Sequence, residues 1–274
     1  MLHDPANCKL GKGPARHGKL RLAAYLKADL PPAPAAVDWT AGVTSWGMMG
    51  NDSHGDCVFA AGAHAIQTWT VNAGLPAQVG IERTMSDAVV LSYYSRWAGY
   101  APGDPATDNG FVIVDFLNLW KADDYGGVLL DGFVDPDPAN QEHIKQAVAL
   151  FGGVDIGLQL PVAWQNMDVW DVAEGIDGAP GSWGGHSVWV PAYNATGPLC
   201  VTWGALKQMT WAASQRYSDE AHAIISPAWM DKNGCAVCGL AYRALRADSK
   251  AIADPLRGHA DASFHEGQRR AEIT

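Results

Sequence analysis

The period of the hydrophobic pattern changes about halfway along the chain, and this change limits the possible folds more than any other feature. Apolar residues have helical spacing in the segments before residue 153, and paired glycines at 126–127 and 152–153 end two of these segments. Beyond that point, short segments alternate as strands do. Helices gathered before strands predict an α+β fold with a helical lobe facing a β lobe.

The expected elements follow from this pattern. We expect helices at 60–69, 86–100, 108–127 and 140–153, and strands at 154–160, 186–193, 199–203 and 220–226. The chain then divides into an N-terminal arm at 1–36, a folded domain at 37–253 (helical lobe about 37–150, β lobe about 151–230) and a polar tail at 254–274. The arm ends in the proline-rich LPPAPAA, and we interpret its basic stretch as solvated.

Charge and composition argue against several classes of protein. A net charge of −10 without a basic stripe makes nucleic acid or an anionic membrane an unexpected partner. No run approaches the roughly 18 apolar residues of a membrane span. The first residues hold no apolar signal segment, and the five cysteines form no disulfide framework. We therefore expect a reducing, cytoplasmic location.

One cysteine and one histidine stand in positions suited to chemistry. Cys57 follows a glycine-containing loop and begins an Ala-rich run, and the positive end of a helix dipole would lower its pKa. His186 opens a strand after SWGG, where glycines leave room beside the ring. A nearby imidazole could serve as the base for a thiol nucleophile. The plainer alternative is that Cys57 is a small buried hydrophobe and His186 an ordinary strand residue.

Several short motifs, in the same order, resemble the papain-like (C1-like) cysteine peptidases. VDW and GVT followed by GDC are similar to the family's V-D-W-R, G-x-V-T and C-G-S-C-W segments, and GGHSVWVPAY is similar to G-x-x-H-A-V-x-x-V-G-Y. VTWG resembles N-S-W-G, and DNGF resembles N-G-G-Y. The resemblance runs from about Val37 to about Ser226. It implies a papain-like two-lobe fold with the cleft between a helical lobe and an antiparallel β lobe. It also implies a divergent bacterial or phage-type member without the usual prosegment.

The resemblance assigns catalytic roles to individual residues. Cys57 takes the place of the nucleophile, His186 that of the general base, and Trp203 that of the tryptophan shielding the histidine. The family's oxyanion-hole glutamine is Asn51 here, whose side-chain amide is a suitable donor.

The same resemblance places the substrate. Asp108, Asn109 and Gly110 would form one wall of the cleft, and Gly185 and Trp203 would border it beside the histidine. Together with VDIGLQL, this wall would favour an apolar side chain at the second substrate position. We further hypothesise that residues 1–36 pack across the surface or the cleft.

This chain departs from the family at the residue that orients the histidine. That asparagine aligns with Val201, which cannot form a side-chain hydrogen bond. Thr202 could substitute if the strand is offset by one residue, and Asn194 in the preceding hairpin is a weaker candidate. Without an orienting partner the imidazole could rotate, and activity should fall.

Other candidate residues have structural interpretations. His64 would share a helix face with Cys57 and is expected to pack in the core, and His54 is expected in a loop. Cys235 and Cys238 form one C-x-x-C pair, but a zinc site needs two more ligands. We therefore expect neither a metal nor a cofactor.

The sequence thus predicts a cysteine-dependent peptidase or amidase, a thiol protease acting on a peptide or protein through an acyl-enzyme. Val201 and Asn51 leave a second possibility open, a catalytically weak or inactive papain-fold binding or structural module. A third is an amide transferase or ligase that uses the same thiol. An acidic thiol at Cys57 would distinguish an enzyme from a binding module.

Overall fold

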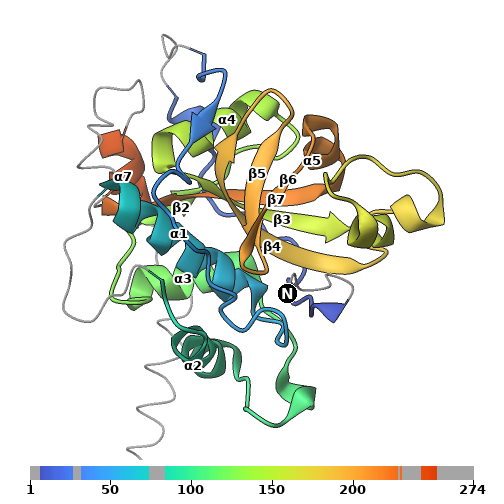
Figure 1. The fold of residues 1–274 in the computed structure, drawn as a ribbon. Coiled ribbons are helices and arrows are strands. Elements are labelled where there is room, and N and C mark those ends of the chain that lie inside the picture. The colour runs from blue at the N-terminus through green and yellow to red at the C-terminus, as the bar shows by residue number, and fades with distance from the viewer. Residues whose placement is uncertain (1–6, 27–31, 74–83, 228, 230–241, 252–274) are drawn as a thin grey trace, which may run out of the picture.

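The computed structural model describes residues 7–26, 32–73, 84–227, 229 and 242–251, and these form an α+β fold. Figure 1 shows α1, α2 and α3 gathered on one side and a sheet accompanied by α4 and α5 on the other. The α-helices are α1 (Cys57–Ala73), α2 (Asp87–Ala98), α3 (Ile113–Ala122), α4 (Gln141–Phe151), α5 (Trp211–Tyr217) and α7 (Tyr242–Ala251). Short 3-10 turns are η2 (Leu22–Ala24), η3 (Pro105–Thr107), η4 (Val162–Asn166) and η5 (Ile176–Gly178).

The strands form one antiparallel sheet in the order β2-β7-β3-β4-β5-β6, and β1 pairs with β4. The strands are β1 (Val37–Asp38), β2 (Gly132–Val134), β3 (Val154–Leu160), β4 (Gly184–Tyr193), β5 (Pro198–Thr202), β6 (Ala205–Gln208) and β7 (Ser218–Ile225). The predicted α+β class, with helices before strands and an antiparallel sheet, is therefore confirmed. β2 and β6 were not predicted, because three or four residues are too short to display a period.

Helix boundaries have local causes. α4 begins after Asn140, whose side chain accepts hydrogen bonds from the backbone N–H groups of Glu142 and His143. It ends at Gly152, whose φ of 76° is the left-handed conformation that glycine adopts without strain. α3 is shorter than the predicted 108–127, because the loop before it is engaged by other parts of the chain.

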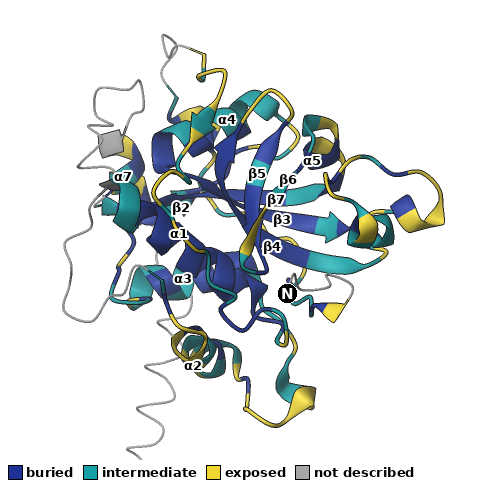
Figure 2. Ribbon diagram, in the orientation of Figure 1, coloured by how far each residue is buried: buried dark blue, intermediate teal, exposed yellow. Residues whose placement is uncertain are grey.

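α1 joins the two halves of the fold. Its alanines, among them Ala61, Ala63 and Ala65, are almost fully buried, so the helix can lie close to its neighbours. Trp189 of β4 donates from its indole N–H to Thr68 Oγ1 at 3.0 Å and packs edge-on against Trp69. Figure 2 shows the buried residues concentrated in α1 and the central strands. The first turn of α1 is therefore held at a fixed place beside β4.

The described part of the N-terminal arm is solvated only in part: Arg16, Lys19 and Arg21 are exposed, as the sequence interpretation expects, but Lys12 is buried. Leu22 is fully buried. The Leu22 N–H donates to the Asp135 carbonyl, and the Asp135 N–H donates to the Leu20 carbonyl. Leu20 and Leu22, which stand between basic residues, thus anchor the arm to the body of the fold. The predicted tail at 254–274 lies outside the described residues.

Candidate active site

Cys57 is the first residue of α1, and its side chain is buried with 1% exposure. Burial raises the pKa of its thiol to about 12, although hydrogen bonds from the backbone of Ser187 and Gly11 oppose the rise. The sequence analysis expected the helix N-terminus to lower this pKa. In this structure desolvation outweighs the helix dipole, so the thiol is protonated.

His186 lies near the start of β4 and is also fully buried. Its Nε2 is 2.7 Å from Thr202 Oγ1, and its ring stacks on Trp203 with centroids 4.6 Å apart. Its Nδ1 is buried and has no hydrogen-bond partner among the described residues. Burial lowers the pKa of His186 to about 3, so the imidazole is neutral.

Thr202 is therefore the residue that contacts the histidine. Asn194 instead holds the β4–β5 turn, where its Oδ1 accepts from the Thr196 and Gly197 N–H groups. Trp203, directly after Thr202, has a φ of 46°, an uncommon backbone conformation for a large side chain. Strained residues of this kind cluster at functional sites. Here the strained backbone carries the indole that covers the imidazole.

Asn51 helps to fix the loop before Cys57. Its side-chain amide donates to Asp56 Oδ1 at 3.2 Å and to the His54 carbonyl at 3.3 Å. Asp56 is fully buried, and burial raises its pKa well above the usual value. The NH₂ group that the sequence assigned to an oxyanion hole is thus engaged within the loop.

The predicted cleft wall is a rigid loop. Asp108 accepts hydrogen bonds from Lys9 Nζ at 2.6 Å, the Tyr94 hydroxyl at 2.7 Å and the Gly55 N–H at 2.9 Å. Burial would raise the pKa of Asp108, but these three donors hold it below its usual value. Asn109 donates to the Ala106 carbonyl, and Gly110 turns the chain with a φ of 71°.

Residues 9–13 of the arm lie between this wall and β4. The Phe111 N–H donates to the Gly11 carbonyl at 2.8 Å, and the Gly13 N–H donates to the Phe111 carbonyl at 2.7 Å. On the other side, the Lys12 N–H donates to the Gly185 carbonyl at 3.1 Å. The fit is close, because a Cβ on Gly11 would lie 1.8 Å from the Gly55 carbonyl oxygen.

Four of the predicted site residues thus contact the arm, namely Cys57, Asp108, Gly110 and Gly185. Sequence reasoning missed the residues on the arm side, Gly11 and Lys12. The only local signal was the closely spaced glycines of LGKG, since glycine is suited to close backbone approach.

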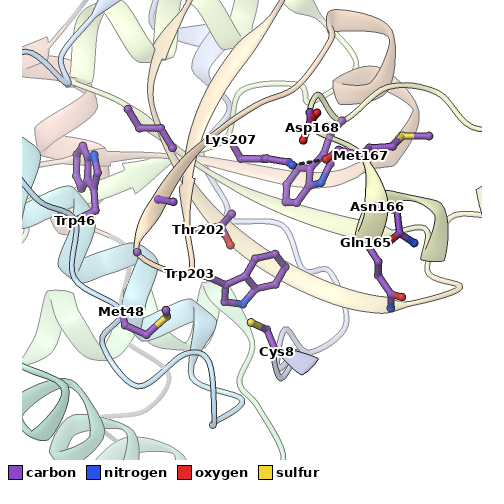
Figure 3. A pocket seen from close by; sticks show the side chains of 14 residues that line it. Cys8, Trp46, Met48, Gln165, Asn166, Met167, Asp168, Thr202, Trp203 and Lys207 are labelled. Atoms are coloured by element: carbon purple, nitrogen blue, oxygen red, sulfur yellow. Dashed lines mark hydrogen bonds between the residues drawn. The ribbon is translucent and has the colours of Figure 1, made fainter. Parts of the chain in front are cut away.

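Thr202 and Trp203 also line a pocket of about 580 Å³. Figure 3 shows Trp46 and Met48 on one side of it and Met167 on the other, with Lys207 reaching from β6 to the Met167 carbonyl. Because Thr202 and Trp203 also contact His186, a ligand in this pocket would lie next to the residues that hold the imidazole.

His64 and His54 have the structural roles that the sequence analysis expected. His64 is buried and faces the Gly47 carbonyl, and burial lowers its pKa to about 4. His54 packs edge-on against Tyr100 in a loop. The described residues contain no cluster of three or more potential metal ligands. Cys235 and Cys238 lie outside them. In the described part of the chain, no helix is long and apolar enough to cross a bilayer.

Comparison with known proteins finds similar folds but no close relative. No family model matches the chain, and no curated protein matches it. Xylellain, a cysteine protease from Xylella fastidiosa, is 13% identical, with a TM-score of 0.49 over 80% of this chain and 97% of its own. Digestive procathepsin L 3 of Tenebrio molitor is 14% identical, with a TM-score of 0.49 over 77% of this chain and 75% of its own.

A third similar structure holds the cysteine protease and lectin-like domains of a surface layer associated protein of Clostridium difficile. It is 12% identical, with a TM-score of 0.47 over 82% of this chain and 57% of its own. These neighbours are cysteine proteases, but the likeness is remote. What the site does in this chain follows from its own residues.

Proposed function

We propose that the protein is a cysteine-dependent peptidase or amidase in which Cys57 is the nucleophile and His186 the general base. One observation carries the proposal. The Cys57 thiol, at the first turn of α1, lies against the backbone of Ser187 in β4, and Ser187 directly follows His186. Thr202 contacts His186 Nε2, and His186 Nδ1 has no partner among the described residues. An unpaired Nδ1 alone does not mark a base, because the buried His64 has one too. What distinguishes His186 is its place next to Ser187, whose backbone faces the Cys57 thiol.

The tautomer of His186 that fits its contact with Thr202 is also the one that a general base needs. When Nε2–H donates to Thr202 Oγ1, Nδ1 carries a lone pair that can accept the thiol proton. The thiolate then attacks the carbonyl carbon of a peptide or amide, and the imidazolium returns its proton to the leaving amine. Water, activated by the same nitrogen, hydrolyses the thioester and releases the acid.

The oxyanion needs donors near Cys57. The backbone N–H of Cys57, at the start of α1, is one candidate. Asn51 can supply a second after its NH₂ group exchanges Asp56 for the substrate oxygen. Thr202 acts as a positioning residue and not as a catalytic one, because its hydroxyl hydrogen-bonds to the imidazole.

This chemistry requires the arm to move. The backbone of Gly11 donates a hydrogen bond to the Cys57 sulfur. For the thiolate to attack, a substrate carbonyl carbon must instead lie about 3–3.5 Å from that sulfur. With the arm in place, thiol and imidazole are both neutral. We therefore propose that the arm holds the enzyme in a latent state, and that a peptide or protein substrate enters after the arm leaves.

The complete burial of Cys57 favours one alternative. A binding or structural module needs no acidic thiol, and a pKa of about 12 fits that role as the structure stands. Amide transfer or ligation would use the same residues with an amine in place of water as the acceptor.

Gly11→Ala in the full-length chain provides the test, because the added Cβ cannot fit against Gly55. We expect this variant to hydrolyse members of a peptide library. Cys57→Ala or His186→Ala in the same background should reduce turnover by roughly a thousandfold or more. Turnover that is unchanged by both substitutions, or no turnover although Cys57 has become reactive, would reject the peptidase proposal in favour of the binding module.

A further inference from the structure

The side chain of Lys12 is fully buried in a pocket that the arm fills from outside. Its Nζ lies 2.9 Å from Glu220 Oε1 and 3.0 Å from Asp219 Oδ2, and it also donates to the Gly13 carbonyl at 3.2 Å. The ammonium therefore has a partner for each of its three N–H bonds. We call this cavity the Lys12 pocket; its walls are Gly157, Gly185, Asp219 and Glu220.

The pocket is formed by an irregularity in the sheet. Gly157 pairs with Glu220, but Leu158 pairs with Ser218, so Asp219 is the extra residue of a β-bulge. Consecutive strand residues normally point to opposite faces. The bulge turns Asp219 so that both it and Glu220 reach the same ammonium. Gln159 Nε2 then fixes Asp219 Oδ2 at 2.6 Å.

Missing side chains make the space for the lysine stem. A Cβ on Gly157 would lie 2.2 Å from Lys12 Cε, and a Cβ on Gly185 would lie 2.7 Å from the Lys12 carbonyl oxygen. The cavity is thus shaped for a long unbranched chain with a cation at its end.

The protein itself does not neutralise these carboxylates without Lys12. His222 is the nearest other cation, and it is engaged by Asp135 Oδ1 at 2.8 Å and by Glu220 Oε2 at 3.1 Å. Glu220 Oε1, which faces Lys12, receives no hydrogen bond from the body of the fold. Asp155 adds another buried carboxyl whose Oδ2 has no hydrogen-bond partner among the described residues. Burial raises the pKa of Asp155 to about 7, but the pKa of Glu220 is lowered, and a buried carboxylate that stays ionised requires a cation.

We infer that the Lys12 pocket is a recognition site for a lysine or arginine side chain of a peptide, and that Lys12 is its intramolecular occupant. The inference rests on the proposed function insofar as the peptide is a substrate. The pocket adjoins the thiol, because Ser187, two residues after Gly185, faces the Cys57 sulfur. The apolar preference expected from the sequence is replaced by a cationic one. The sequence could not predict this preference, because it depends on a β-bulge at Asp219, 207 residues after Lys12.

The first test uses the full-length chain and the alkylation rate of Cys57 by iodoacetamide, which reports arm opening without any turnover. Lys12→Arg should leave Cys57 protected, whereas Lys12→Met, of similar length but uncharged, should raise the rate more than about tenfold, since a buried carboxylate left unpaired costs well over the 1.4 kcal/mol of a tenfold ratio. Lys19→Met is the matched control, because Lys19 is exposed on the same arm and should have no effect. Equal protection by lysine and methionine would overturn the inference.

The second test places the occupant on a separate peptide. In full-length Gly11→Ala/Cys57→Ala protein, fluorescein-labelled Leu-Gly-Lys-Gly-Pro-Ala and its arginine analogue should bind more than about tenfold more tightly than the methionine analogue. Asp219→Asn, at the partly exposed rim, should reduce that ratio toward one even if Glu220→Gln fails to fold. A ratio near one before that substitution would overturn the inference. If the protein binds the lysine peptide preferentially but never hydrolyses any peptide, the proposed peptidase function would be rejected, and the assignment of the Lys12 pocket as a recognition site would stand.

Discussion

The Lys12 pocket and the Cys57 site are both buried, but burial has opposite consequences in the two regions. In the Lys12 pocket each charge has a counter-charge, so Glu220, His222 and Lys12 form a network of ion pairs. Beside Cys57 the carboxyls of Asp56 and Asp155 raise the pKa of the thiol further, and desolvation leaves both the thiol and His186 neutral. Burial therefore permits a charge where the side chain of Lys12 meets carboxylates, and disfavours one at Cys57, although the neighbouring Gly11 donates a hydrogen bond to the sulfur.

Removing the carboxylate of Glu220 should have the largest effect on the ion pairs of the Lys12 pocket. Glu220→Gln would remove one of the two carboxylates paired with Lys12 and one of the two paired with His222, and we expect it to lower the free energy of unfolding by about 3–5 kcal/mol. Urea denaturation measures the effect. Asp123→Asn, which removes the exposed pair with Arg96, should cost only about 0–1 kcal/mol. Equal losses in the two variants would contradict the account of the pocket.

The pH dependence of stability should show whether His222 is charged in this network. Hydrogen bonds and charges from Asp135 and Glu220 outweigh the burial that would lower the pKa of His222, and raise it from 6.5 to about 9. A raised pKa means that this stabilisation is complete below pH 6.5 and is lost as pH rises through 9. We expect the free energy of unfolding to fall by up to about 3 kcal/mol between pH 6.5 and 9.

Two neighbouring groups titrate mainly outside this window. Burial raises the pKa of Asp155 to about 7, so its effect falls mostly below pH 7, and burial lowers the pKa of His186 to about 3. Urea titrations at several pH values between 7 and 9 therefore report chiefly on His222. A flat profile in the natural chain, or an equally steep one in His222→Gln, would show that the network does not hold a charged histidine.

A smaller effect is expected at the imidazole. Thr202→Val keeps the shape of the side chain but removes the hydroxyl that contacts His186 Nε2 at 2.7 Å. In the Gly11→Ala background we expect kcat to fall about tenfold to a hundredfold with little change in KM, because a buried N–H left unsatisfied costs about 1–3 kcal/mol. Thr202→Ser should restore most of the rate. Equal rates for valine and serine would mean that Thr202 does not position the ring.

Local signals explain how much of the fold the sequence predicts. β3 occupies 154–160 as expected because its pattern is unbroken, and α4 agrees within a residue or two because Asn140 and Gly152 mark its ends. Short strands such as β2 carry no such signal; they exist because a longer neighbour, here β7, supplies the hydrogen bonds.

The site shows the same limit. Cys57 and His186 could be selected from their own flanks, but the choice between Thr202 and Asn194 depended on how β5 and the preceding turn place their side chains. The pKa directions at Cys57 and His186 could not be predicted, because they depend on how deeply the fold buries each group. Lys12 was beyond sequence reasoning, since its role depends on a bulge 207 residues later in the chain.

Iodoacetamide labelling of Cys57 as a function of pH, in the natural chain and in Gly11→Ala, shows directly whether the arm keeps the thiol unreactive. Gly99→Ala controls for general destabilisation, because Gly99 has a φ of 75° and no heavy atom within 4 Å of an added Cβ. The account predicts that Cys57 is nearly inert in the natural and control chains. In Gly11→Ala it should react well below the ordinary thiol pKa of about 8.5, and His186→Ala should remove that reactivity. Equal labelling of the natural and Gly11→Ala chains would show that the arm does not silence the thiol.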